Sequence, residues 1–273
     1  FILLFSVVAF KLQDNSLLLN ATTLHEKLIQ TTNDFKGLSI VNHLLLFLII
    51  SGGAFWKKGR DILFALFMIH LSIGVFISAF KHSIPSNYFY FPVVVGLIGY
   101  AMKTQKIRFD FNALSLQDKI IGSIALSGGF YYLALVESPI WINALIYSPV
   151  GVVNCPTMLA LCGFLILNSE QGNRSRLLEY FVICGALFFG GLGLLTMYVY
   201  YDIILVAVAL YMTLRLWKES YNSPKSIIYK LAQKQKITLT RQRRCTHGEN
   251  NCIESSVRYI RDCGNRSKNY PET

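Results

Sequence analysis

The chain has 273 residues, of which 53% are hydrophobic and only 15% are charged, and its mean hydropathy is +0.43. Globular domains carry about 25% charged residues, so this composition excludes an ordinary water-soluble protein. The net charge of +11 is concentrated near the C-terminus. From Arg215 onward the sequence holds thirteen Lys and Arg against five Asp and Glu.

The N-terminal residues form an apolar stretch of their own. Phe1–Phe10 is too short to cross a bilayer, and Lys11 and Asp14 end it. We interpret residues 1–21 as an extension, either interfacial or the remnant of a signal sequence or an upstream helix. His25–Lys36 then predicts a short amphipathic approach to the first membrane span.

Seven apolar runs with almost no charge follow one another along the chain. A bilayer-spanning helix needs about 17–25 apolar residues, and each run is long enough or nearly so. The sequence therefore predicts an all-α, polytopic transmembrane bundle over residues 22–217. It has seven spans, or six if residues 178–217 form a single one. The runs are Leu38–Phe55, Ile62–Phe80, Tyr88–Met102, Ile120–Val136, Val152–Leu167, Leu178–Leu195 and Ile203–Trp217.

Basic residues alternate along the connections between the runs. They cluster after the first, third, fifth and seventh runs, whereas Lys81–Asn87, Glu137–Gly151 and Met197–Asp202 are poor in them. Basic loops stay in the cytoplasm. We therefore expect a multi-pass membrane protein with its N-terminal side outside and its C-terminal tail in the cytoplasm.

The tail over residues 218–273 predicts a partly disordered, basic segment. Anionic headgroups attract Lys and Arg near the membrane surface, so we expect the tail to bind anionic lipid rather than nucleic acid. The sequence indicates no particular protein partner. The residues expected to bind lipid lie in a stretch without a single acid: Lys225, Lys230, Lys234, Lys236, Arg241, Arg243 and Arg244.

Polar residues within the second run favour a hypothesis of function. His70, Gly74 and Ser78 are spaced four residues apart and share one helix face. Ionisable groups inside a membrane are costly and often functional, so His70 is a candidate contact for a proton or a ligand. The structural alternative is a neutral histidine that is hydrogen-bonded to a neighbouring helix.

The densest polar cluster is Asn154, Cys155, Pro156 and Thr157. Pro156 removes a backbone donor, and broken backbone at membrane depth must be buried or face water. One interpretation is therefore a polar pocket. The other places Pro156 in the first turn of a helix, where proline is well accommodated. The preceding Pro139–Val153 predicts an interfacial segment able to cover such a pocket as a lid.

Two acidic residues are expected at the same depth as this cluster. Asp202 opens the seventh run and Glu137 closes the fourth, both on the outer side. They complete the candidate pocket with Asn154, Cys155, Pro156, Thr157 and His70. The alternative is that Asp202 caps its helix N-terminus, where negative charge is favoured, while Glu137 is solvated.

The sequence carries no soluble catalytic motif and no metal motif. It lacks a phosphate-binding glycine loop, His-Glu-x-x-His and Gly-x-Ser-x-Gly. The tail residues Cys245, His247, Cys252 and Cys263 are poorly spaced for zinc. We therefore interpret the three cysteines as free thiols and expect neither a metal nor a cofactor.

An ordered set of motifs resembles a known family. The set consists of Thr22–Phe35, Ile84–Tyr88, Ile107–Phe111, the Cys-Pro-Thr at 155–157 heading a run, and Asp202 opening the last run. It resembles an uncharacterised family of bacterial polytopic membrane proteins, domain of unknown function 6064. The likeness covers about Thr22 to Leu216. It implies the polytopic topology and no assigned activity.

Three classes of function stay open at this point. The leading hypothesis is a small transporter- or channel-like bundle with an outward-facing polar pocket. The alternatives are a non-catalytic structural or sensory membrane subunit and, with less support, a membrane-embedded enzyme. They differ in whether the polar residues of the bundle converge on one cavity or contact neighbouring helices singly.

Overall fold

A computed structural model describes residues 21–56, 59–135, 141–169 and 174–220. These residues form helices joined by turns, and no β-strand occurs among them. The chain divides into two units, Phe1–Leu216 and Trp217–Thr273. The second unit is described only up to residue 220, so the basic tail and its lipid-binding set lie outside the described residues.

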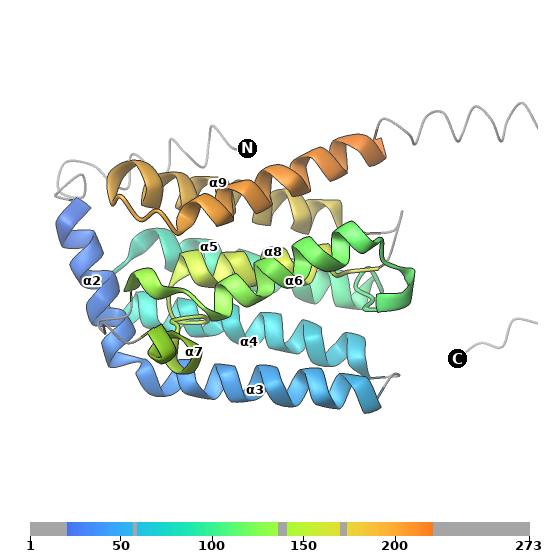
Figure 1. Ribbon diagram of the computed structural model, residues 1–273, viewed down its shortest axis with the longest axis horizontal. Coiled ribbons are helices and arrows are strands. Elements are labelled where there is room, and N and C mark those ends of the chain that lie inside the picture. Colours follow the sequence, from blue (N-terminus) through green and yellow to red (C-terminus); the bar gives the residue numbers. More distant parts are fainter. Residues whose placement is uncertain (1–20, 57–58, 136–140, 170–173, 221–273) are drawn as a thin grey trace, which may run out of the picture. The chain divides into compact units, whose positions relative to one another are not determined.

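Each of the seven apolar runs overlaps a helix (Figure 1). Three of these helices are long and apolar enough to cross a membrane, over Lys36–Gly53, Arg60–Lys81 and Arg176–Thr196. This finding fits a membrane protein. The helices are α3 (Lys36–Phe55), α4 (Arg60–Lys81), α5 (Pro85–Lys103), α6 (Leu116–Phe130), α8 (Asn154–Ile166), α9 (Arg176–Thr196) and a last helix over residues 202–220.

Two of the seven helices are shorter than their apolar runs. α6 has 15 residues and α8 has 13, which at 1.5 Å per residue gives about 23 and 20 Å. The hydrocarbon core of a bilayer is about 30 Å thick. The predicted runs are longer because they also take in residues 131–135 and 152–153, which are largely apolar without being part of these helices.

The outer face of α3 is apolar and exposed. Leu44, Phe47 and Leu48 are each more than half exposed, and so is Phe55 at the C-terminal end of the helix. A surface helix of a soluble protein turns its polar side outward. The reversed pattern on α3 is what a lipid-facing helix requires.

Successive helices run up and down, so their connections gather at two ends of the bundle (Figure 1). One end carries the C-terminal ends of α3, α5 and α8 together with residues 104–115, and we call it the basic end. The other carries the α4–α5 turn, the short helix α7 (Ala144–Tyr147) and the hairpin at 197–201. We call it the α2 end, after α2 (Ala21–Asp34).

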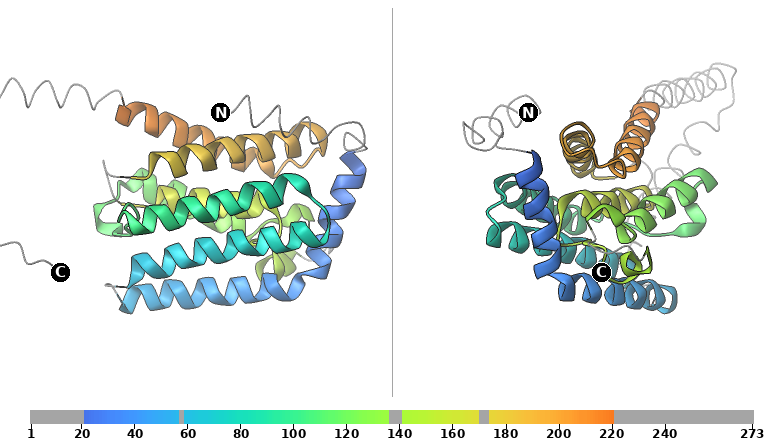
Figure 2. Two further views of the ribbon diagram at one scale, coloured as in Figure 1. Left: turned by 180° about the vertical axis from the view of Figure 1, so that it is seen from behind. Right: turned by 60° about the vertical axis from the view of Figure 1, so that its left-hand side comes forward.

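The amphipathic approach to the first span is helical. α2 crosses the end of the bundle instead of running along it (Figure 2). Leu28 faces the core and is 5% exposed. Asp34, at the end of α2, forms ion pairs with Lys81 at 3.2 Å and with His82 at 3.3 Å. α2 is thus tied to the end of α4.

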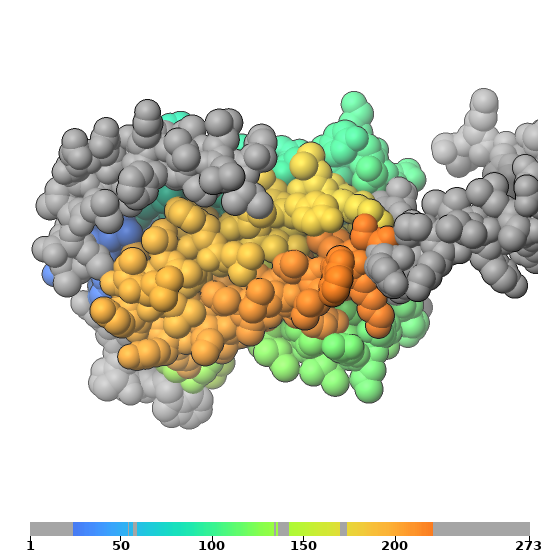
Figure 3. Space-filling view, turned by 90° about the horizontal axis from the view of Figure 1, so that it is seen from above, coloured from blue at the N-terminus to red at the C-terminus, as the bar shows by residue number. Residues whose placement is uncertain are grey.

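The apolar core surrounds α8, which packs against α6, α4 and α9. Twelve of its residues are buried, from Cys155 to Ile166. A helix that is apolar all round is a buried helix. α9 and the last helix lie side by side (Figure 3), with Gly190 against Leu205 and Val206.

Short 3-10 turns complete the connections. η1 (Phe111–Ala113) precedes α6, η2 (Leu133–Leu135) follows it, and η3 (Trp141–Asn143) leads into α7. α6 begins at a Ser-x-x-Asp motif, in which the Ser115 hydroxyl accepts a hydrogen bond from the Asp118 N–H at 3.1 Å. This is the capping that a helix N-terminus requires.

Candidate functional site

Residues 148–153 form a non-helical segment that is buried inside the bundle. All six are buried, with Ser148 and Val150 at 0% exposure. The segment leaves α7, enters the bundle and ends where α8 begins. Non-helical backbone at membrane depth must have its polar groups satisfied by protein or water. We call residues 148–153 the buried segment.

Side chains from three helices satisfy the backbone of the buried segment. The Asn42 amide donates to the Val150 carbonyl at 2.7 Å, and the Ser78 hydroxyl donates to the Val152 carbonyl. The Gly151 N–H donates to the Thr157 hydroxyl at 2.7 Å. These three polar residues therefore hold the segment at its depth in the bundle.

The approach of α4 to the buried segment requires glycine on both sides. A Cβ atom on Gly74 would lie 2.2 Å from the Gly151 carbonyl oxygen. Gly151 itself has a φ angle of +72°, a conformation that residues with a side chain rarely adopt. The face shared by His70, Gly74 and Ser78 thus packs on the buried segment.

His70 supports this arrangement and does not line a cavity. Its Nε2 is 2.8 Å from the Asn42 Oδ1, so it orients the amide that binds Val150. The structure therefore favours the structural alternative for His70, a histidine bonded to a neighbouring helix. The partner of His70 is Asn42, which lies on the neighbouring helix α3.

A small cavity lies at the α2 end, with a volume of about 40 Å³. A water molecule needs roughly 10–15 Å³ measured in this way, so the cavity has room for about three. Its walls come from α2, the start of α5, the start of α8 and the end of α9. They are Leu24, Leu28, Ile84, Ser86, Asn154, Cys155, Phe189, Leu192, Gly193 and Met197.

The cavity contains part of the predicted pocket. Asn154 and Cys155 line it, whereas Pro156 and Thr157 do not. Pro156 occupies the first turn of α8, in agreement with the start-of-helix interpretation. Glu137 lies outside the described residues.

The lid of this cavity differs from the predicted one. Leu24 and Leu28 of α2 form part of the wall, and none of the described residues between 141 and 153 does so. The expectation that Pro139–Val153 covers the pocket is wrong for this described part, because residues 148–153 are buried in the bundle instead.

Asp202 lies directly behind the cavity wall. Its carboxyl group is 1% exposed and accepts a hydrogen bond from the Tyr132 hydroxyl at 2.5 Å. The Cys155 thiol interacts with the same carboxyl group. Its Oδ2 packs against Gly193, so closely that a Cβ atom there would lie 1.7 Å away. Asp202 thus meets Cys155 and Gly193, both of which line the cavity.

Burial raises the pKa of Asp202 to about 6, against the effect of the hydrogen bond from Tyr132, which lowers it. The residue precedes the apolar run Ile203–Trp217 and so lies outside it. A carboxyl group with this pKa changes its protonation near neutral pH.

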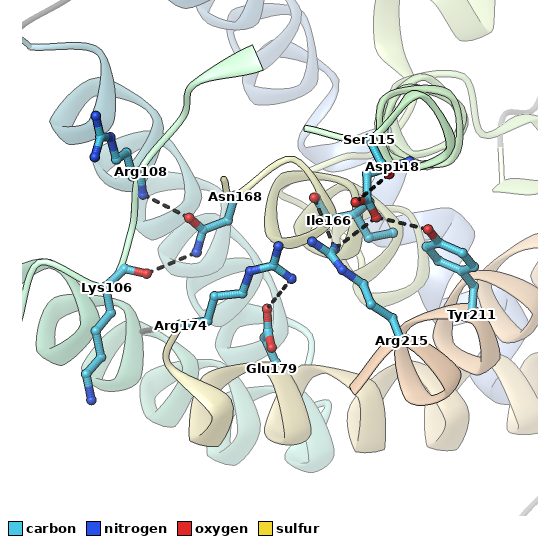
Figure 4. A network of polar contacts seen from close by, with 10 residues as sticks. All are labelled: Lys106, Arg108, Ser115, Asp118, Ile166, Asn168, Arg174, Glu179, Tyr211 and Arg215. Atoms are coloured by element: carbon cyan, nitrogen blue, oxygen red, sulfur yellow. Dashed lines mark hydrogen bonds and ion pairs between the residues drawn. The ribbon is translucent and has the colours of Figure 1, made fainter. Parts of the chain in front are cut away.

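A second polar cluster, at the basic end, was not expected from the sequence. Asp118 of α6 accepts hydrogen bonds from Ser115 at 2.8 Å and from Tyr211 at 2.9 Å (Figure 4). Arg215 lies 3.4 Å from Asp118 and donates to the Ile166 carbonyl at 3.1 Å. The Ser-x-x-Asp spacing could have indicated Ser115 and Asp118, whereas no local signal points to Tyr211.

The same end is joined by further contacts between connections. Asn168 accepts from the Arg108 N–H at 2.9 Å and donates to the Lys106 carbonyl at 3.0 Å (Figure 4). Arg174 and Glu179 form a buried pair at 3.9 Å. Polar contacts therefore join the helices and their connections at the basic end, whereas the cavity lies at the opposite end.

Comparisons with known proteins add nothing to this geometry: no family model, curated protein or solved structure matches the chain. Within the described ranges, no three His, Cys, Asp or Glu residues are grouped closely enough to hold a metal ion. The tail residues Cys245, His247, Cys252 and Cys263 lie outside those ranges.

Proposed function

We propose that this chain is a small membrane transport protein whose solute site is the cavity at the α2 end. The observation that carries the proposal is the interrupted path through the bundle: the buried segment enters and α8 starts from it as a short inner helix. Interrupted helices of this kind form the solute sites of many transporters. The first residues of α8, Asn154 and Cys155, line the cavity.

The chemistry of the cavity favours a very small polar solute or an ion. The N-terminus of α8 carries a partial positive charge and lines the cavity with Asn154 and Cys155. The Asp202 carboxyl group stands behind the wall at Gly193. Most of the lining is apolar. A volume of about 40 Å³ admits only a few non-hydrogen atoms, so this arrangement fits a closed state.

The proposed topology has seven spans, with the basic end and the tail in the cytoplasm. The alternation of basic loops supports this orientation. α8 is short, but it is buried among other helices and so needs no lipid contact of its own. The resemblance to domain of unknown function 6064, the location in a bacterial inner membrane and the binding of the tail to anionic lipid belong to the same proposal.

The test is transport in liposomes that contain the purified protein. Jumps of ammonium, sodium, potassium, chloride and pH are applied, and charge movement is recorded on a solid-supported membrane. A trapped pH dye detects electroneutral exchange with protons. We expect a protein-dependent signal that Asn154→Leu abolishes, while Asn112→Leu, at the other end in η1, leaves it intact.

The alternatives predict a different outcome. A structural or sensory subunit gives the response of empty liposomes with every ion, and this result would refute the proposed function. A signal that survives Asn154→Leu unchanged would place the transport path elsewhere in the bundle.

A further inference from the structure

The starting observation is a carboxyl group that is buried and only half satisfied. Asp202 is 1% exposed, and its Oδ1 accepts the Tyr132 hydroxyl. Its Oδ2 has no hydrogen-bond donor among the described residues. A buried carboxylate oxygen without a donor is costly, and protonation removes that cost.

No cation among the described residues compensates this carboxyl group. The groups around it are Tyr132, which follows α6, Cys155 from α8 and Gly193 from α9. The ring of Tyr201, the neighbour of Asp202, lies 5.7 Å from that of Tyr132 and is tilted against it. Among the described residues, no Lys, Arg or His forms an ion pair with Asp202. An incoming proton is therefore the simplest source of positive charge.

The geometry also gives the proton a path. Cys155 lines the cavity and interacts with the Asp202 carboxyl group, so a single side chain separates cavity water from the acid. A thiol both donates and accepts weak hydrogen bonds. In the structure the S–H group donates to the Phe189 carbonyl at 3.9 Å, so it must rotate toward Asp202 before its proton passes to the carboxylate while the sulfur takes a proton from water.

We infer that Asp202 is an exchangeable proton-binding site, loaded from the cavity at the α2 end through the Cys155 thiol. In the loading step one O–H bond of a hydronium ion in the cavity breaks and one O–H bond forms on Asp202. The charge of the carboxyl group changes from −1 to zero. The thiol is unchanged after the step. The inference deepens the proposed function by naming the proton as its coupling ion.

Infrared difference spectroscopy of the protein in lipid tests the inference directly. Lowering the pH should produce the C=O band of a protonated, buried carboxyl group, with a midpoint near the pKa of about 6. Asp202→Asn should remove this band. Asp34→Asn, which removes an ion-paired and more exposed carboxylate at the same end, should leave it.

The role of Cys155 has its own measurement. Cys155→Ala removes a polar neighbour that lowers the pKa of Asp202, so the midpoint should rise, and hydrogen–deuterium exchange of the band should slow. Cys155→Ser keeps a group able to relay a proton, and exchange should stay fast. Equal exchange in the serine and alanine variants would overturn the relay.

Two results would overturn the site itself: a titrating band that persists in Asp202→Asn, or a band that responds to sodium instead of pH. Both readouts are independent of transport. An absent current with an intact band would refute the proposed function alone, whereas a current without the band would refute only this inference.

Discussion

The contact between α4 and the buried segment makes Gly74 the most sensitive position for a small substitution. In Gly74→Ala, the added Cβ atom would meet the Gly151 carbonyl oxygen at 2.2 Å. The obstacle is backbone rather than the end of a flexible side chain. The variant must therefore move α4 or the buried segment, even though alanine favours a helix more than glycine does.

The magnitude follows from three contributions to the free energy of unfolding. Overpacking a core costs about 1–3 kcal/mol. A shifted segment also weakens the bonds from Asn42 to Val150 and from Gly151 to Thr157, each worth about 0.5–1.5 kcal/mol. The higher helix propensity of alanine adds about 1 kcal/mol to the free energy of unfolding. The net expectation for Gly74→Ala is a loss of about 2–3 kcal/mol.

The matched control is Gly96→Ala on α5, where an added Cβ atom meets nothing within 4 Å. This variant should gain stability by up to about 1 kcal/mol. Unfolding by SDS in mixed micelles, followed by far-UV circular dichroism, measures both. Equal midpoints for the two variants would refute the placement of residues 148–153 against α4.

Three further substitutions test other parts of the structure by the same unfolding assay. Asn42→Leu leaves the Val150 carbonyl without its donor and should lose about 1–3 kcal/mol, with Gly96→Ala again as the reference. Tyr211→Phe removes the hydrogen bond to Asp118 and should lose about 1 kcal/mol, whereas Tyr200→Phe, at an exposed position, should be neutral. The pKa of Asp202 is raised from 3.8 to about 6, so its contribution to stability is full below pH 3.8 and is lost as the pH rises through 6. The loss amounts to about 3 kcal/mol, and Asp202→Asn should flatten this pH dependence; an unchanged slope would contradict the assignment.

Much of the helical architecture could be predicted because apolar runs are a local signal. Each run contains a helix, and α2 was expected as an amphipathic approach to α3. The positions where this signal failed are the ends of α6 and α8. There residues 131–135 and 152–153 continue the apolar pattern, although Tyr132 donates its N–H to the Ser148 hydroxyl instead of continuing a helix.

The burial of residues 148–153 could not be predicted, because it depends on partners far away in the sequence. Asn42 is 108 residues from Val150, and Ser78 is 74 residues from Val152. An apolar Ser-Pro-Val-Gly-Val-Val stretch fits an interfacial loop just as well. Tyr211 lies 93 residues from Asp118, so the cluster at the basic end was hidden for the same reason.

Within the candidate site, the sequence could not assign roles to the polar residues. Asn154 and Cys155 line the cavity with Asp202 behind its wall, whereas Thr157 and His70 act on the buried segment. The difference lies in the direction of each side chain. Spacing along a helix gives the shared face of His70, Gly74 and Ser78, yet it does not say whether that face meets a cavity or another stretch of backbone.

The polar residues that hold the buried segment differ from Asp202 in how many of their hydrogen-bonding groups have a partner. This difference distinguishes a structural role from a chemical one. Asn42 makes bonds on both sides of its amide, to Val150 and to His70, so its burial is explained by holding the segment in place. Asp202 accepts the Tyr132 hydroxyl on one carboxyl oxygen and keeps the other without a donor among the described residues. Packing alone does not account for this second oxygen. The proton site inferred above does, because protonation removes the cost of a buried carboxylate oxygen without a donor.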